Sequence, residues 1–118
     1  MTWVGSWRNQ YGSVLEITSE GNGRIEGSFR SAVGSNIKGQ QVDVSGVHEG
    51  DLISFAVGER GIVVSWTGML RGVRMETLWH LVTGEKLTAD AEGVPARKQS
   101  LEWWQAMTTG ADTFERVT

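Results

Sequence analysis

Two short polar side chains frame the first turn of the chain. Asn9 and Ser13 stand on either side of residues 10–12, between two short stretches that read as strands. If those strands run antiparallel, both side chains point to the same end of the sheet. An amide offers an acceptor and a donor, and a hydroxyl offers a rotatable O–H. Such groups at the end of an apolar cavity orient the polar head of a small ligand, although Asn and Ser also satisfy the backbone of ordinary turns.

Tryptophan is the unusual residue of the composition, with six copies in 118 residues. That many large rings in a small domain predict an aromatic-walled cavity or a large interface. Trp66 and Trp79 fall on the inward faces of segments that alternate between apolar and polar residues. In a small barrel such rings can also simply fill the interior, as we expect for Trp7 and Phe114.

The elements that must position these residues are strands. Apolar and polar residues alternate, with glycine-rich turns between the alternating segments. After a first short strand that ends near Asn9, the predicted strands span residues 13–19, 24–31, 42–47, 52–57, 62–70, 74–82 and 112–117. Hairpin-length connections make sequential strands antiparallel neighbours, and closure into a barrel hides the sheet edges. We predict an all-β fold, an eight-stranded antiparallel up-and-down β-barrel.

The segment 83–100 breaks this rhythm. Pro95 suits the first turn of a helix that runs through Leu101 and Trp104 toward Met107, with Gly110 ending it. We therefore predict a short helical segment before the last strand.

Length, charge and hydropathy exclude several classes of protein. A chain of 118 residues fits a single domain, residues 1–118. The formal charge of −3 and the scattered basic residues give no reason to expect nucleic acid. No apolar run approaches the length of a membrane span. The N-terminus lacks a signal-peptide pattern, so the protein is either secreted or periplasmic after removal of such a peptide, or cytoplasmic.

The chain shows no arrangement of residues that is typical of an enzyme or a metal site. It has no cysteine, which excludes disulfides, thiol catalysis and zinc–thiolate sites. His48 precedes a turn, where we expect it to be solvated, and His80 alternates outward on a different strand. No paired carboxylates and no nucleophile–base pair are evident. We predict a binding protein that is not an enzyme and needs no cofactor.

With its strands laid out, the sequence resembles the avidin and streptavidin family over roughly residues 5–117. The matching segments occur in family order and at nearly family spacing. They are Gly5-Ser6-Trp7-Arg8-Asn9-Gln10-Tyr11-Gly12-Ser13, Gly27-Ser28-Phe29-Arg30-Ser31-Ala32-Val33-Gly34, Trp66-Thr67-Gly68, Thr77-Leu78-Trp79 and Trp104 with Gly110-Ala111-Asp112-Thr113-Phe114.

The resemblance implies non-catalytic binding of biotin at the open end of the barrel. By motif position, Asn9 and Ser13 would bond the ureido oxygen, and Ser31 and Asp112 the ureido N–H groups. A pocket that pairs every polar group of a urea rejects ligands that lack one. The remaining implied contacts are the walls Trp66, Trp79 and Phe55, the loop residues Gly34 and Ser35 at the ligand carboxylate, and Trp104, which family members lend to a neighbouring subunit.

Two residues depart from the family pattern. Phe29 stands where the family usually has Tyr, a third donor to the ureido oxygen, and Val64 stands where it usually has a Thr that approaches the ring sulfur. Each lost hydrogen bond weakens binding by about 1–3 kcal/mol. The alternatives to biotin are a different, more apolar small ligand, or an oligomeric assembly module with a vestigial pocket.

Outward apolar residues on the late strands predict a homo-oligomer, a dimer or a tetramer. Val63, Leu78 and Leu70 would lie beside one another on an isolated barrel. Contiguous exposed apolar surface usually marks a partner. Trp104 is expected to contribute to that interface.

Overall fold

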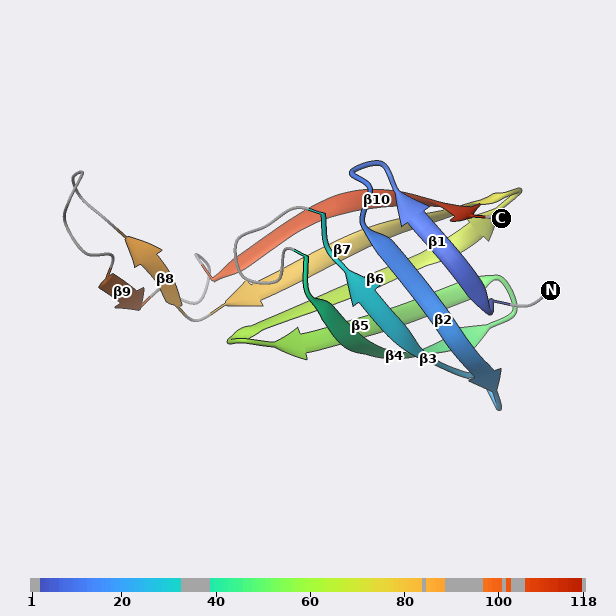
Figure 1. Cartoon of the computed structure of the whole chain (residues 1–118), viewed down its shortest axis with the longest axis horizontal. Helices are drawn as coiled ribbons and strands as arrows, with labels where there is room; N and C mark the ends of the chain where they lie inside the picture. The colour runs from blue at the N-terminus through green and yellow to red at the C-terminus, as the bar shows by residue number, and fades with distance from the viewer. Residues whose placement is uncertain are drawn as a thin grey trace.

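The computed structural model describes residues 3–32, 39–83, 85–88, 97–100, 102 and 106–117. These residues form strands and turns, and they contain no helix, so none that could span a membrane. The strands are β1 (Gly5–Asn9), β2 (Val14–Gly21), β3 (Arg24–Arg30), β4 (Gln41–Glu49), β5 (Leu52–Glu59), β6 (Ile62–Arg71), β7 (Arg74–Thr83), β8 (Glu85–Thr88), β9 (Arg97–Ser100) and β10 (Met107–Val117) (Figure 1).

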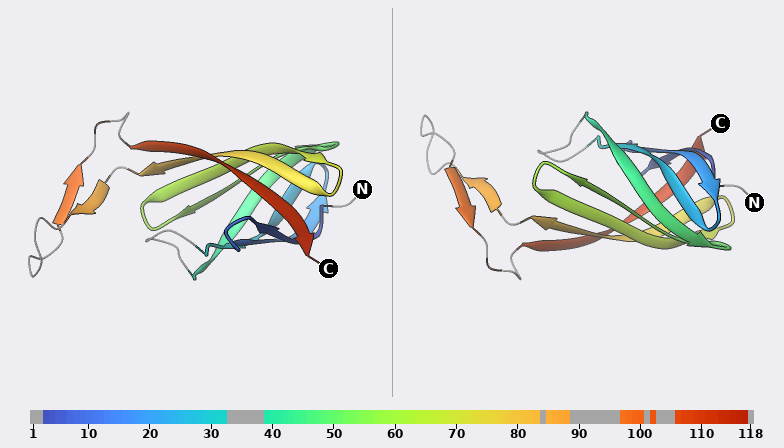
Figure 2. Two further views of the ribbon diagram at one scale, coloured as in Figure 1. Left: turned by 90° about the horizontal axis from the view of Figure 1, so that it is seen from above. Right: turned by 90° about the horizontal axis from the view of Figure 1, so that it is seen from below.

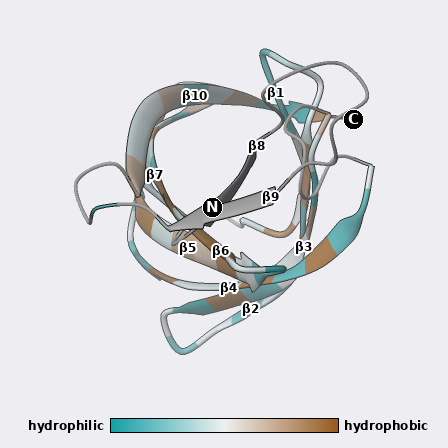
Figure 3. Cartoon of the chain, turned by 90° about the vertical axis from the view of Figure 1, so that its left-hand side faces the viewer, coloured by the Kyte–Doolittle hydropathy of each residue, from teal (hydrophilic) through white to brown (hydrophobic). Residues whose placement is uncertain are grey.

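Eight of the strands close into an antiparallel barrel in the order β1-β10-β7-β6-β5-β4-β3-β2. From β1 to β7, strands that follow one another in sequence are neighbours. β10 closes the barrel by pairing with β7 on one side and with β1 on the other, and β8 and β9 lie between β7 and β10 in the chain. β8 and β9 pair with each other in a small sheet beyond one end of the barrel (Figures 1 and 2). Figure 3 looks along the barrel from that end and shows the closed ring. The predicted eight-stranded barrel is confirmed.

Inward-facing side chains alternate along every barrel strand and form one apolar core. The expected faces of residues 13–19 and 24–31 are confirmed, with Leu15, Ile17 and Ile25 completely buried. Trp7 and Phe114 are also completely buried, as expected of rings that fill the interior. This core fills the interior of the barrel beneath the end that carries the turn between β1 and β2.

The helix predicted before the last strand does not occur in the described residues. Arg97–Ser100 is strand β9, and residues 107–110 belong to β10, where Met107 pairs with Val82 and Gly110 with Trp79 of β7. Cross-strand hydrogen bonds to β7 satisfy the backbone that a helix would have satisfied internally. Of the remaining residues of the prediction, Glu102 and Ala106 are described, and the N–H of Ala106 donates to the carbonyl of Glu102 at 3.1 Å. Leu101 and Trp104 lie outside the described residues.

Two side chains are more buried than we expected. Leu70 is partly buried and packs against the core, because it continues the inward alternation of Val64 and Trp66 along β6. His48 likewise continues the inward alternation of β4; it lies 3.6 Å from Glu20, and its side chain is only 18% exposed, so it is not solvated. His80 is exposed, as predicted.

Candidate functional site

Four buried polar residues gather at the barrel end that carries the β1–β2 turn, which we call the Asn9 end. Asn9 is the last residue of β1, Ser13 precedes β2, Ser31 follows β3, and Asp112 lies on β10. Each is less than 8% exposed. The β1–β10 pairing sets Asn9 opposite Phe114, two residues beyond Asp112, which brings the two ends of the chain to one place. Asn9 and Asp112, which are 103 positions apart in the sequence, thus come within hydrogen-bonding distance.

The turn holds the amide of Asn9 in one orientation. Its Oδ1 accepts hydrogen bonds from the backbone N–H of Tyr11 at 3.0 Å and of Ser13 at 2.9 Å. Gly12 closes the turn with a φ of 87°, a conformation that glycine adopts without strain. With Oδ1 occupied by two donors, the NH₂ group faces Asp112, and Nδ2 donates to Asp112 Oδ2 at 3.2 Å. An amide nitrogen carries two protons, so Asn9 keeps a second one for another acceptor.

The hydroxyl of Ser13 is oriented by the chain that follows β3. Its Oγ accepts a hydrogen bond from the backbone N–H of Ala32 at 2.8 Å. Because that contact uses a lone pair, the hydroxyl proton remains available to donate. Ser31, next to Ala32, is buried at the same end. Asn9 and Ser13 therefore each present a donor.

The carboxylate of Asp112 is the acceptor of the cluster. Oδ2 accepts from Asn9 Nδ2 and from Trp66 Nε1, the latter at 3.0 Å, and Oδ1 accepts from Gln10 Nε2 at 3.3 Å. Thr77 Oγ1 donates to the backbone carbonyl of Asp112 at 2.8 Å and so fixes the strand beneath the side chain. Several hydrogen bonds of this kind offset the cost of burying a charge.

Aromatic rings lie directly beneath this polar group. Trp66 is stacked on Phe55, with ring centroids 5.1 Å apart and 17° between the planes, and lies 4.8 Å from the ring of Phe29. Val64 is buried on the same face of β6. Since Trp66 also donates to Asp112, it joins the apolar wall to the polar end.

Trp79 is the neighbour of Trp66 on β7 and is only partly buried. Its indole crosses β10 at Gly110, where an added Cβ would lie 2.6 Å from Trp79 Cε2 and 2.9 Å from Nε1. The absence of a side chain at Gly110 therefore leaves room for the ring to lie against the strand. The sequence had instead pointed to this glycine as the end of a helix.

Most of the predicted site residues thus meet at one end of the barrel. Those that the structure brings together are Asn9, Ser13, Phe29, Ser31, Phe55, Val64, Trp66, Trp79 and Asp112. Gly34, Ser35 and Trp104 lie outside the described residues. Sequence reasoning missed Gln10 and Thr77: Thr77 shares the inward face of Trp79, which was a usable signal, whereas nothing in the turn sequence marks Gln10.

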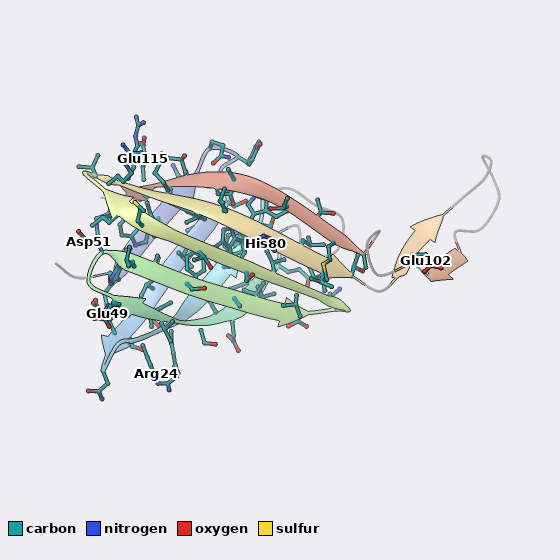
Figure 4. All side chains as sticks on the ribbon, turned by 180° about the vertical axis from the view of Figure 1, so that it is seen from behind. Arg24, Glu49, Asp51, His80, Glu102 and Glu115 are labelled. Atoms are coloured by element: carbon teal, nitrogen blue, oxygen red, sulfur yellow. The ribbon has the colours of Figure 1, made fainter. Side chains whose placement is uncertain are left out.

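Charge and metal-ligand chemistry are sparse at this end. Among the described residues, no group of three or more acidic or histidine side chains could hold a metal ion. In Figure 4 the labelled side chains of Arg24, Glu49, Asp51 and Glu115 lie at the end of the barrel away from β8 and β9, whereas Glu102 lies beside β9. The site is therefore a set of neutral donors around one carboxylate, above a wall of aromatic rings, which is suited to holding a small neutral polar group.

Comparison with known proteins places the chain among β-barrel binding proteins. The family model described as "Avidin family" matches residues 1–117. The structure of core-bradavidin is 31% identical, with a TM-score of 0.69 over 93% of this chain and 96% of that chain. A bradavidin2–biotin complex is 23% identical, with a TM-score of 0.74 over 100% of both chains. Apo shwanavidin has the same identity of 23% and TM-score of 0.74, over 99% of this chain and 97% of that one.

Proposed function

The chain belongs to the avidin family, and we propose that it binds biotin at the Asn9 end of the barrel with the ureido group held by Asn9, Ser13, Ser31 and Asp112. Members of the avidin family are non-catalytic biotin-binding proteins, in agreement with the prediction that this chain is not an enzyme. Biotin is in this case a ligand and not a cofactor.

The observation that carries the proposal is the alternation of donors and an acceptor around one point. The second N–H of Asn9 Nδ2 and the O–H of Ser13 are donors suited to a ureido oxygen. The carboxylate of Asp112, with Ser31 at the same end, is suited to the N–H groups that flank that oxygen. A cyclic urea has this same pattern, a carbonyl between two N–H groups, so every buried polar group gains a partner when it binds.

The rings beneath the polar group fit the rest of the ligand. Trp66, Phe55 and Phe29 form a contiguous aromatic surface, and Trp79 adds a partly exposed edge on the neighbouring strand. Such surfaces can bury a bicyclic ring and an alkyl chain without leaving a buried polar group unpaired. We propose that Gly34 and Ser35 meet the ligand carboxylate and that Trp104 reaches a neighbouring subunit; these three roles rest on the sequence resemblance.

The apolar residues Phe29 and Val64 support a weaker hold on biotin than a site with hydroxyls at both positions. Both side chains are at most 5% exposed and face the interior. Because neither side chain contains a polar atom, neither position can offer the ligand a hydrogen bond. The same two residues favour a ligand that keeps the cyclic urea and has fewer polar or polarisable groups in the rest of the molecule. Desthiobiotin has the urea and lacks the thioether ring, so it separates these possibilities.

The test is a titration of the purified chain with biotin and with desthiobiotin, read by calorimetry and by thermal unfolding. Biotin should raise the melting temperature, because a ligand that binds only the native state stabilises it. Asp112→Ala should weaken binding by about 2–3 kcal/mol, roughly 30- to 150-fold. Asp43→Ala, an exposed aspartate on β4, is the matched control and should leave affinity unchanged.

Absence of a melting shift at millimolar biotin would refute the proposal. A shift with desthiobiotin alone would replace biotin by a different urea ligand. If neither compound shifts the melting temperature, the result would favour the alternative that the protein is an assembly module with a vestigial pocket.

We also propose that the protein is a homo-oligomer, a dimer or a tetramer. Val63 of β6, Val82 of β7 and Met107 of β10 are cross-strand neighbours and all point outward, as does Leu78 at 60% exposure. Val63, Val82 and Met107, which we call the β6–β7–β10 face, are adjacent exposed apolar side chains of the kind that marks a partner. Leu78 lies further along β7, beyond His80. Leu70, which we had placed there, is partly buried against the core and takes no part.

A further inference from the structure

We propose that Gln10 is a positioning residue for the binding site: its carboxamide holds the Asp112 carboxylate in the orientation that receives the ligand. The inference deepens the proposed function and rests on it. Gln10 itself need not touch the ligand, because it lies in the exposed turn that follows β1.

The carboxamide of Gln10 reaches across to β10 and bonds to three successive residues of that strand. Nε2 donates to the carbonyl of Ala111 at 3.0 Å and to Asp112 Oδ1 at 3.3 Å, while Oε1 accepts from the N–H of Thr113 at 3.0 Å. The two backbone contacts settle which end of the amide faces which way. A backbone N–H can only donate and a carbonyl can only accept, so Nε2 must lie on the Asp112 side.

This bond supplies what the other donors to Asp112 do not. Asn9 and Trp66 both donate to Oδ2, and of the hydrogen bonds in the described residues only that of Gln10 reaches Oδ1. The terminal torsion of an aspartate is broad, so donors on a single oxygen leave the carboxylate plane free to rotate. A third donor on the other oxygen, anchored to the backbone on both sides, fixes the plane.

The backbone beneath the carboxylate is held separately. Thr77 Oγ1 bonds to the carbonyl of Asp112 from β7, on the inner side of the barrel. Loss of Gln10 also removes its two contacts to the β10 backbone, but the pairing with β7 and the Thr77 bond should keep the strand in place, so the side chain of Asp112 is the part released. This separates a positioning role from a general role in folding the turn.

The first experiment needs no ligand. The indole N–H of Trp66 is bonded to Asp112, so its ¹H–¹⁵N signal, assigned by Trp66→Phe, reports on the carboxylate. Gln10→Ala should shift this signal and speed its hydrogen exchange. The indole of Trp7, which donates to the carbonyl of Trp3 at the other end of the barrel, should not change.

The matched control is Gln41→Ala. Gln41 is an exposed glutamine at the start of β4 and also accepts a cross-strand hydrogen bond, from Arg30 at 3.3 Å. It has no contact with Asp112 in the described structure, so its loss should leave the Trp66 signal and biotin binding unchanged. An unchanged Trp66 signal in Gln10→Ala would overturn the proposal.

The second experiment is a double-mutant cycle in biotin affinity. Gln10→Ala should weaken binding about tenfold in the wild-type background, as expected for a hydrogen bond to a charged group. In an Asp112→Ala background the same change should cost less than twofold, because no carboxylate remains to be held. Equal losses in the two backgrounds would mean that Gln10 only supports the turn.

A further variant guards against misfolding of Gln10→Ala. Gln10→Glu is nearly isosteric and can still accept from the N–H of Thr113, but it sets a second carboxylate beside Asp112. It should weaken biotin more than Gln10→Ala at neutral pH and recover as the introduced carboxyl protonates in acid. A flat pH profile relative to wild type would count against the proposal. If wild type bound no biotin, the proposed function would fail, while the Trp66 signal would still decide the role of Gln10.

Discussion

Gly110→Ala should damage both the stability of the barrel and the wall of the binding site. An added Cβ at this position would lie 2.6 Å from Trp79 Cε2 and 2.9 Å from Nε1, whereas ordinary van der Waals contact begins at 3.4 Å. The indole must therefore move by roughly an ångström, or β10 must move away from β7. Overpacking of this size costs about 1–3 kcal/mol of the free energy of unfolding.

A second effect of the same substitution has the opposite sign. Replacing glycine by alanine inside a strand stabilises the native state by about 0.5–1 kcal/mol, because the unfolded chain loses freedom. Gly58→Ala measures that term alone, because Gly58 is an exposed position of β5 and a Cβ there would find its nearest neighbour, Val63, at an ordinary 3.8 Å. The difference between the two variants isolates the clash with Trp79.

The assay is urea unfolding of both variants, followed by biotin dissociation kinetics. Gly110→Ala should be about 1–3 kcal/mol less stable than Gly58→Ala and should release biotin faster, since Trp79 no longer lies in place. Trp79→Phe should relieve much of the stability loss in the double variant, because a smaller ring leaves room for the methyl group. Equal stabilities of the two alanine variants would refute the packing of Trp79 against Gly110. An unchanged rate of biotin dissociation from Gly110→Ala would mean that Trp79 does not contact the ligand.

Two further predictions concern the donors and the outer face. Phe29→Tyr adds a hydroxyl beside Trp66 and should slow biotin dissociation by roughly fivefold, or about 1 kcal/mol, in stopped-flow competition; a faster or unchanged rate would mean that the urea lies elsewhere. Val63→Lys, on the β6–β7–β10 face at 52% exposure, should shift the protein toward smaller species in light scattering, whereas Val47→Lys on β4, at 50% exposure, should not. Identical masses for the two lysine variants would contradict the proposed interface.

The architecture was predictable because it depends on local patterns. Period-two alternation placed Leu15, Ile17 and Phe29 inward, and short glycine-rich turns made neighbours of successive strands. The same alternation, followed strictly, puts Leu70 and His48 inward, so those two errors came from departing from the pattern. Closure of the barrel followed from the need to pair the edge strands.

The segment before the last strand misled the prediction for a different reason. Leu101 and Trp104 are spaced to share one face of a helix, with Trp103 and Met107 on another, and Pro95 and Gly110 resemble its ends. Residues 107–110 instead pair with β7. A short apolar stretch satisfies either geometry, so the available partner strand decides which one forms.

By itself, the sequence determined which residue types the site contains: an amide, hydroxyls, a carboxylate and aromatic rings, each on a predictable face of a strand. Only the tertiary structure decided how they are joined. The register of β10 against β1 and β7 sets Asp112 beside Asn9, Trp66 and Thr77, and the reach of Gln10 across that strand fixes the second carboxylate oxygen. Hydrogen bonds between residues about 35 to 103 positions apart leave no periodic trace in a sequence, because they depend on where the barrel closes.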